Sequence, residues 1–284
     1  MRTITAAVVR TLLIPVLVLG GIEAAHSQAT PARKIYVSVI EKSGTPVTDL
    51  TAADFELKVG GKGQQVTSAQ LTKVPLRMAL IVADGGTGAV QYPAATLVQR
   101  LQQAGEFAIV SVVEQPEKLV NFTSDMEALA AGFKRIGPRS NKPSRGQLME
   151  ALSETVKDVG QEGKRSVIVV LTVGGAASSN LRSDVVRDDL RKNGTTLYVI
   201  EPPGSGTGAS DLDVVLNDGA RESGGRVEQV AGPNLVKAAE QISQELLNQY
   251  EVSFAGEGLK PGDKLELSSK RKGVKVNAPT RLAG

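Results

Sequence analysis

The middle of this chain alternates nearly continuous apolar runs with amphipathic segments, a pattern that few folds accommodate. Arg77–Asp84 (RMALIVAD), Glu106–Glu114 (EFAIVSVVE) and Ser166–Val173 (SVIVVLTV) are the clearest runs, and Thr195–Glu201 (TTLYVIE) follows the same pattern. Strands of this composition are buried on both faces, as in parallel sheets that helices cover. Because segments with helical periodicity such as Gln147–Val159 separate them, the sequence predicts an α/β fold with a doubly wound, mostly parallel sheet.

In both flanks of this region, apolar residues instead recur at every second position. Ile35, Val37 and Val39 alternate with polar residues near the start, and Tyr250–Phe254 and Val274–Ala278 do so near the end. Such alternation is typical of half-buried strands. Because lone hairpins are marginally stable in water, we expect the flanks to pair into one small antiparallel β unit. The predicted organisation is a leader at 1–29, a β segment at 30–75, an α/β domain at 76–249 and a β segment at 250–284 that pairs with the first.

The first 29 residues have the features of a secretory signal peptide. Arg2 and Arg10 form a positively charged start, a short apolar run follows at Leu12–Gly21, and small residues suited to cleavage after Ser27 or Ala29 come next. The run is shorter than the ~20 apolar residues that a membrane-spanning helix needs, although an uncleaved anchor is an alternative. We therefore expect an exported protein, periplasmic or extracellular, with no membrane span once the signal is removed.

Composition excludes several classes of function. Cysteine is absent, so thiol catalysis, disulfides and cysteine-based zinc sites are excluded. The one histidine, His26, lies in the predicted leader, so the mature chain has no imidazole for a catalytic triad, for acid–base chemistry or for a metal site. Aromatic residues make up only 3%, which argues against single-strand nucleic-acid binding by base stacking. We expect a protein that is not an enzyme and does not bind nucleic acid.

Three loops should converge at one edge of the predicted sheet. They are Asp84–Gly88 (DGGTG), Ser144–Gln147 (SRGQ) and Thr172–Gly175 (TVGG), of which the first and third directly follow apolar runs. In an open α/β sheet, ligands bind beyond the carboxyl ends of the strands. A binding site is therefore expected among these loops.

The order of elements and these three loops resemble a von Willebrand factor A domain. The likeness is greatest to the bacterial subgroup that carries a signal peptide and flanking β segments, through VSVIEKSGTPVTDLTAADFELKVGGKGQQV, GQLMEAL and ELLNQYEVSF. The resemblance implies a metal-ion-dependent adhesion site with five oxygen ligands, an Asp-x-Ser-x-Ser motif, a Thr and an Asp. Mapped onto this chain, those positions hold Asp84, Gly86, Gly88, Gly146 and Val173, so one ligand of five remains.

Asp84 alone is a poor metal site, because Mg²⁺ requires near-octahedral geometry and usually more than one side chain. We expect no resident cofactor. The alternative is a Mg²⁺ or Mn²⁺ site with unusual ligands, in which Thr87, Ser144 and Thr172 supply hydroxyls. In the simpler interpretation Asp84 accepts hydrogen bonds from amides of its own loop. A phosphate-binding loop is disfavoured, since the Lys-Ser/Thr ending of a P-loop is missing.

The remaining features of the sequence are expected to have structural roles, in a turn, a helix cap or the core. Lys270–Lys272 is predicted to be a solvated hairpin turn, and Asp211 to cap the helix near 212–222. Tyr198 and Tyr250 lie in predicted strands and are expected to pack in the core or at an interface.

The sequence thus predicts an exported, non-enzymatic protein–protein interaction or adhesion module, metal-independent because the ligands are replaced. Its partner would be another protein, bound by the loops or by β-unit edges such as Val274–Ala278. The alternatives are metal-dependent adhesion through Asp84 and, with less support, a nucleotide-dependent enzyme. The candidate binding residues are Asp84, Gly85, Gly86, Thr87, Gly88, Arg145, Gly146, Gln147, Thr172, Val173 and Gly174.

Overall fold

The computed structural model describes residues 32–205 and 210–284, so the predicted leader lies outside the described residues. The α/β core is built on a six-stranded sheet in the order β12-β11-β9-β5-β6-β7. All neighbours are parallel except β7, which runs antiparallel to β6 at one edge. The strands are β5 (Leu76–Ala83), β6 (Gly105–Val112), β7 (Pro116–Thr123), β9 (Arg165–Thr172), β11 (Thr196–Glu201) and β12 (Val227–Gln229).

The prediction of a doubly wound sheet is confirmed. Counted along the chain from β5, the strand order is 3-2-1-4-5-6 from the β7 edge, which is the doubly wound order with its reversal beside the first strand. Together with the antiparallel edge strand, this gives the core the von Willebrand factor A-type fold that the resemblance implied.

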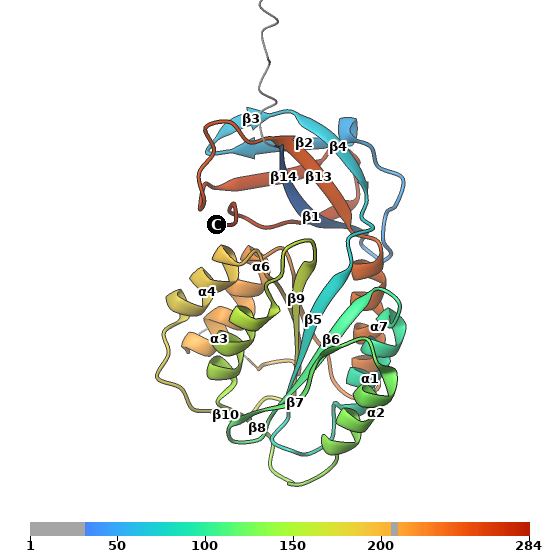
Figure 1. Cartoon of the computed structure of the whole chain (residues 1–284), viewed down its shortest axis with the longest axis vertical. Coiled ribbons are helices and arrows are strands. Elements are labelled where there is room, and N and C mark those ends of the chain that lie inside the picture. Colours follow the sequence, from blue (N-terminus) through green and yellow to red (C-terminus); the bar gives the residue numbers. More distant parts are fainter. Residues whose placement is uncertain (1–31, 206–209) are drawn as a thin grey trace, which may run out of the picture. The chain divides into compact units, whose positions relative to one another are not determined.

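Helices cover both faces of the sheet (Figure 1). Successive residues of β5 explain why its sequence is continuously apolar, because Leu80 packs with one helix layer and Ile81 with the other, both without exposed surface. The first layer contains α1 (Gln91–Leu101), α2 (Met126–Arg135) and α7 (Asn234–Leu247). The second contains α3 (Leu148–Val159), α4 (Ser183–Lys192), α5 (Asp211–Val214), a π-helical turn (Val215–Gly219) and α6 (Ala220–Glu222).

The two flanks of the chain form a two-sheet β unit, as expected. One sheet has the order β15-β1-β13-β4 and the other the order β14-β2-β3. Their facing side chains share one core, in which Tyr250 packs edge-on against Phe55 with 5.7 Å between ring centroids. The strands are β1 (Ala32–Glu41), β2 (Phe55–Val59), β3 (Lys62–Gln64), β4 (Val66–Leu71), β13 (Tyr250–Ala255), β14 (Leu265–Ser269) and β15 (Val274–Asn277), and a 3-10 turn (Ala52–Asp54) precedes β2.

The hairpin predicted at Lys270–Lys272 is wrong. β14 pairs with β2 and β15 pairs with β1, so the basic run crosses from one sheet to the other. Arg271 makes two hydrogen bonds to Asp49, at 2.6 and 3.1 Å, and Lys270 Nζ donates to the Ala53 carbonyl at 2.8 Å. Two of the three basic side chains therefore fasten the crossing to the other end of the chain.

A buried polar cluster joins the β unit to the core. Glu245 of α7 is 1% exposed and accepts hydrogen bonds from Tyr198 Oη at 3.1 Å, Asn277 Nδ2 at 3.0 Å and Arg226 Nε at 2.6 Å. Tyr198 comes from β11 and Asn277 from β15, so one carboxylate connects a helix, the central sheet and the β unit. Burial, first of all, and the nearby Glu245 charge raise the pKa of Tyr198 well above its usual value. Both tyrosines singled out from the sequence, Tyr198 and Tyr250, are buried as expected.

Among the described helices, none is both long enough and apolar enough to cross a bilayer.

Candidate functional site

Asp84 lies directly after β5, at the carboxyl edge of the sheet, and is 1% exposed. Its Oδ1 accepts from the Gly86 amide at 2.9 Å and its Oδ2 from the Thr87 hydroxyl at 3.2 Å. Both carboxylate oxygens are thus engaged by the loop that carries them, as the simpler interpretation of the sequence predicted. The Ala89 amide donates to the Thr87 hydroxyl in turn, at 3.3 Å. These amides are directed at their own loop, whereas a phosphate-binding loop directs its amides at the ligand.

The glycines after Asp84 adopt backbone conformations that side chains disfavour. Gly85 has a φ of +65°, and a Cβ atom there would lie 2.5 Å from the Lys142 carbonyl oxygen. Gly86 also has a positive φ, and its carbonyl accepts from the amides of Arg139 and Ser140 at 2.7 and 3.0 Å. The segment that follows α2 therefore packs directly on this loop, and the serine positions of an adhesion motif are replaced by backbone that only glycine adopts readily.

The second and third loops meet, as the sequence predicted. β8 (Ser144–Gly146) and β10 (Ala176–Ala177) form a short parallel pair, and the Ser178 amide donates to the Gly146 carbonyl at 2.9 Å. On the other side, the Gln147 amide donates to the Glu114 carbonyl at 2.9 Å, which ties the second loop to the end of β6. Backbone hydrogen bonds thus hold these loops in one arrangement.

Arg145 connects the loops of this edge further, through a hydrogen bond and an ion pair. Its Nε donates to the Gly175 carbonyl at 3.0 Å, and its Nη1 lies 2.9 Å from Asp213 Oδ1 in an ion pair whose side chains are only 13% and 7% exposed. Burial opposes ionisation of Asp213, but hydrogen bonds from Arg145 and Ser210 outweigh it and lower the pKa of this carboxyl. A guanidinium therefore joins the second loop, the third loop and α5.

The third loop has no carboxylate where an adhesion site would place one. Val173 is partly buried against the apolar core, and the neighbouring Thr172 hydroxyl accepts from the Gly174 amide at 3.1 Å. A Cβ atom on Gly174 would lie 2.8 Å from the Ser205 hydroxyl, so this loop also is closely packed.

The sequence did not point to a second carboxyl group at this edge. Glu201 ends β11 and is fully buried; Oε1 accepts from Gln229 at 3.1 Å, while Oε2 has no hydrogen-bond partner within the described ranges. Burial raises the pKa of this carboxyl. Its position at the end of an apolar strand was the one available signal, and that position alone does not distinguish a buried acid from a loop residue.

The role predicted for Asp211 is wrong. Ser210 caps α5 by accepting from the Asp213 amide at 3.1 Å, whereas Asp211 Oδ1 accepts from the Ser183 amide at 2.8 Å, at the start of α4. The serine hydroxyl is one residue earlier, in the cap position, and this leaves the Asp211 carboxylate free to reach the next helix.

The donor set at this edge does not fit a divalent ion. Asp84 is the one ligand retained, each of its oxygens already accepts a hydrogen bond from its own loop, and Val173 stands where the adhesion motif has a carboxylate. Across residues 32–205 and 210–284, no group of three or more Asp, Glu, His or Cys side chains is placed to hold a metal. The edge does have a groove of about 360 Å³, whose lining includes Glu114, Gln115, Ser144, Gly146, Gln147 and Ala176–Ser178.

No protein-family model matches the chain, and no curated protein matches its sequence. Solved structures do resemble it. The conserved hypothetical protein BatB of Bacteroides thetaiotaomicron is 16% identical, with 60% of this chain and 95% of BatB covered and a TM-score of 0.45. The vWF domain of the type V pili tip protein Mfa5 of Porphyromonas gingivalis is 11% identical, with 62% and 96% covered and a TM-score of 0.47.

Proposed function

We propose that this chain is an exported, non-enzymatic module that binds a partner protein through the carboxyl-edge loops of its α/β core, without a bridging metal ion. The observation that carries the proposal is that the charged side chains of these loops, Asp84 and Arg145, are bonded to neighbouring groups at the same edge. Asp84 is bonded by its own loop, and Arg145 joins the second and third loops to Asp213. Export rests on the features of the leader sequence.

Loops that hydrogen bonds and an ion pair hold together are suited to recognition of another protein. Loops that already hold one conformation lose little conformational entropy on binding. The groove beside β8 and β10 adds a concave surface, and Ala176, Ala177 and Ser178 are exposed along it. The groove is lined by one glutamate, two glutamines, two serines, a glycine and two alanines, which favours a protein partner that offers backbone or polar side chains.

Metal independence is tested by thermal unfolding in EDTA and in Mg²⁺ or Mn²⁺. We expect the same Tm in all three, since a ligand stabilises only when it binds the native state more tightly than the unfolded one. Asp84→Ala should lower the unfolding free energy by about 1–3 kcal/mol, because two donors lose their acceptor, and by the same amount with and without metal. Asp84→Asn is the matched control, because it keeps one acceptor oxygen for the Gly86 amide. A Tm that rises with metal in the native protein but not in Asp84→Asn would overturn the proposal.

The binding surface is tested with two Ala→Arg variants. Ala177→Arg places a long charged side chain at the groove, and Ala131→Arg places the same side chain on an exposed position of α2. In capture experiments from an envelope fraction in EDTA, we expect the native protein and Ala131→Arg to retain the same partner protein and Ala177→Arg to lose it. Equal retention by both variants would exclude the groove as the binding surface.

A further inference from the structure

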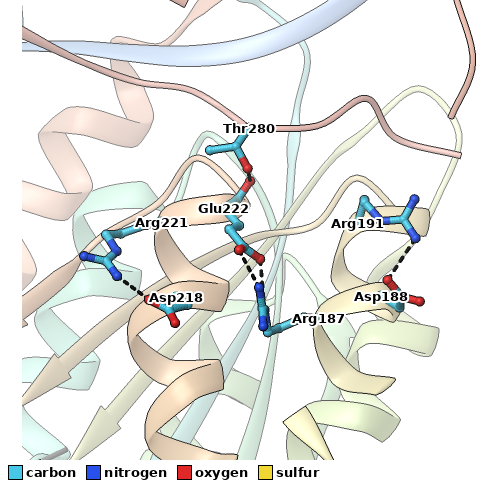
Figure 2. Close-up of polar contacts among 7 residues, drawn as sticks. All are labelled: Arg187, Asp188, Arg191, Asp218, Arg221, Glu222 and Thr280. Carbon is cyan, nitrogen blue, oxygen red and sulfur yellow. Dashed lines mark hydrogen bonds and ion pairs between the residues drawn. The ribbon is translucent and has the colours of Figure 1, made fainter. Parts of the chain in front are cut away.

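A larger cleft lies at the opposite, amino-terminal edge of the sheet. It has a volume of about 700 Å³, and its lining includes the start of β1, the first residues of β9, much of α4 and the C-terminal segment from Pro279. Figure 2 shows its α4–α6 wall, where Arg187 pairs with Glu222 and Arg191 pairs with Asp188. None of the loops proposed to bind a partner contributes to this cleft.

Positive charge is in excess in the cleft. Eight Lys or Arg residues line it, against four Asp or Glu residues. Three of these carboxylates are already neutralised by arginines, and one of them, Asp184, pairs with Arg182 outside the lining. Over the described residues, no carboxylate forms an ion pair with Arg33, Lys192 or Arg281, and all three side chains are at least partly exposed. A concave surface with uncompensated positive charge attracts anionic groups.

Two guanidinium groups of the lining meet at one turn. Arg281 Nη1 donates to the Gly262 carbonyl at 2.9 Å, and Arg191 Nη1 lies 3.0 Å from the position that a Cβ atom on Gly262 would take. The Gly262 amide donates to the Leu282 carbonyl at 2.9 Å, which fixes this turn against the C-terminal segment. Arg191 bonds its helix carboxylate through Nη2, so Nη1 has no hydrogen-bond partner in the described part of the chain. With the adjacent Lys192, these groups offer cationic donors from neighbouring segments.

Two further lining residues lie too deep to contact a ligand. Arg165 is 5% exposed, and its hydrogen-bond partners are the neutral oxygens of Val74, Leu246 and Gln249. Thr195 is 1% exposed, and its Oγ1 has no hydrogen-bond partner within the described ranges. Burial lowers the pKa of Arg165 to about 10, so the group is charged at neutral pH. Its charge adds to the positive potential of the cleft although its donors do not face a ligand.

We propose that this cleft binds an extended acidic segment of another protein, whose Asp or Glu carboxylates pair with Lys192, Arg281 and the free end of Arg191. Guanidinium groups suit carboxylates because they donate two parallel hydrogen bonds, and clustered arginines are a recurring way to recognise acidic segments. Arg33 of β1 lines the same cleft and supplies a fourth cation.

The shape and the mixed charge of the cleft favour a peptide over other anionic macromolecules. Glu162 and the three paired carboxylates would repel the continuous phosphates of a nucleic acid, whereas a peptide places neutral residues opposite them. A flat bilayer does not enter a concave cleft, but a single extended chain does. The acidic segment would bind at the opposite end of the sheet from the carboxyl-edge loops, so the two surfaces are independent.

The full chain is titrated with two fluorescein-labelled peptides of equal length, one of alternating Glu and Ser and one of alternating Gln and Ser, and binding is followed by fluorescence anisotropy. We expect saturable binding of the Glu peptide alone, with an affinity that falls as NaCl is added, because salt screens exposed charges. Lys192→Glu and Arg281→Glu should each weaken binding about fivefold, and the double variant about 25-fold if the two changes add.

Lys134→Glu is the matched control, because it changes the net charge equally at an exposed position of α2, in the other helix layer. It should bind the Glu peptide with native affinity. Equal affinity for the two peptides would overturn the proposal, as would an unchanged affinity in the double variant or an equal loss in Lys134→Glu and Lys192→Glu. Tighter binding of an oligothymidylate or of anionic phospholipid vesicles than of the Glu peptide would also overturn it. None of these results bears on partner binding at the carboxyl edge, which the Ala177→Arg experiment tests separately.

Discussion

Glu245→Gln should be among the most damaging single substitutions in the core, although it conserves size. The native carboxylate is 1% exposed and faces Arg226, whose side chain is 9% exposed. Removing one partner of a buried ion pair costs about 3–5 kcal/mol, because the other charge is left buried. Arg226 keeps a second contact, to Glu228, so we expect the lower end, about 3 kcal/mol. In a domain of this size that lowers the Tm by about 2–4 °C per kcal/mol, or roughly 6–12 °C.

Urea unfolding followed by far-UV circular dichroism measures the effect as a shift in midpoint at constant slope. The double variant Glu245→Gln/Arg226→Met is the control, since replacing both members of a buried pair is often close to neutral. We expect it to be more stable than Glu245→Gln alone. If the single variant loses less than about 1 kcal/mol, a value typical of an exposed pair, Glu245 does not hold the β unit to the core through a buried charge.

Two further predictions concern pH. The pKa of Asp213 is lowered in the folded state. Its contribution to stability is therefore present above the unfolded value of 3.8 and is lost as the pH falls through the folded pKa. The Tm of Asp213→Asn should depend less on pH than the Tm of the native protein between about pH 5 and 2. The pKa of Glu201 is raised above 4.5, so its contribution is full below 4.5 and is lost as the pH rises through the folded pKa. Glu201→Gln stays neutral and should be more stable than the native protein at pH 7, with a gain that disappears below pH 4.5 in urea titrations; no gain at pH 7 would contradict a buried, partly unsatisfied carboxyl.

The sheet was predictable because its signal is local. A strand such as β9 is apolar at nearly every position since it is covered on both faces, and this can be read from eight consecutive residues. The pairing of the flanks followed from a general argument, that isolated hairpins are marginal. The same locality explains the error at Lys270–Lys272, where two alternating segments with a short turn look like a hairpin although β14 and β15 lie in different sheets.

The chemistry of the sites was less predictable because it depends on distant partners. Asp84 was identified from its place after an apolar run and from the family resemblance. Arg145 and Asp213 are 68 residues apart in sequence, and no spacing rule brings them together. Arg165 and Thr195 each begin or precede an apolar strand, where a polar residue usually faces solvent. The hydrogen-bond partners of Arg165 are Val74, Leu246 and Gln249, which are 81 to 91 residues away in sequence, so its burial is not visible in the local pattern.

The two edges of the sheet differ in a way that predicts independent behaviour. β9 rises about 3.3 Å per residue, so Thr172 at one end and Arg165 at the other are about 23 Å apart. Substitutions separated by more than about 7–10 Å with no shared partner usually add to within ~0.5 kcal/mol. Asp84→Ala removes an acceptor from a satisfied cluster and should destabilise, whereas Thr195→Val removes an unsatisfied hydroxyl and should not. The change in the free energy of unfolding of the double variant should equal the sum of the two single changes. A coupling above about 1 kcal/mol would show that the two edges communicate through the sheet and would refute their independence.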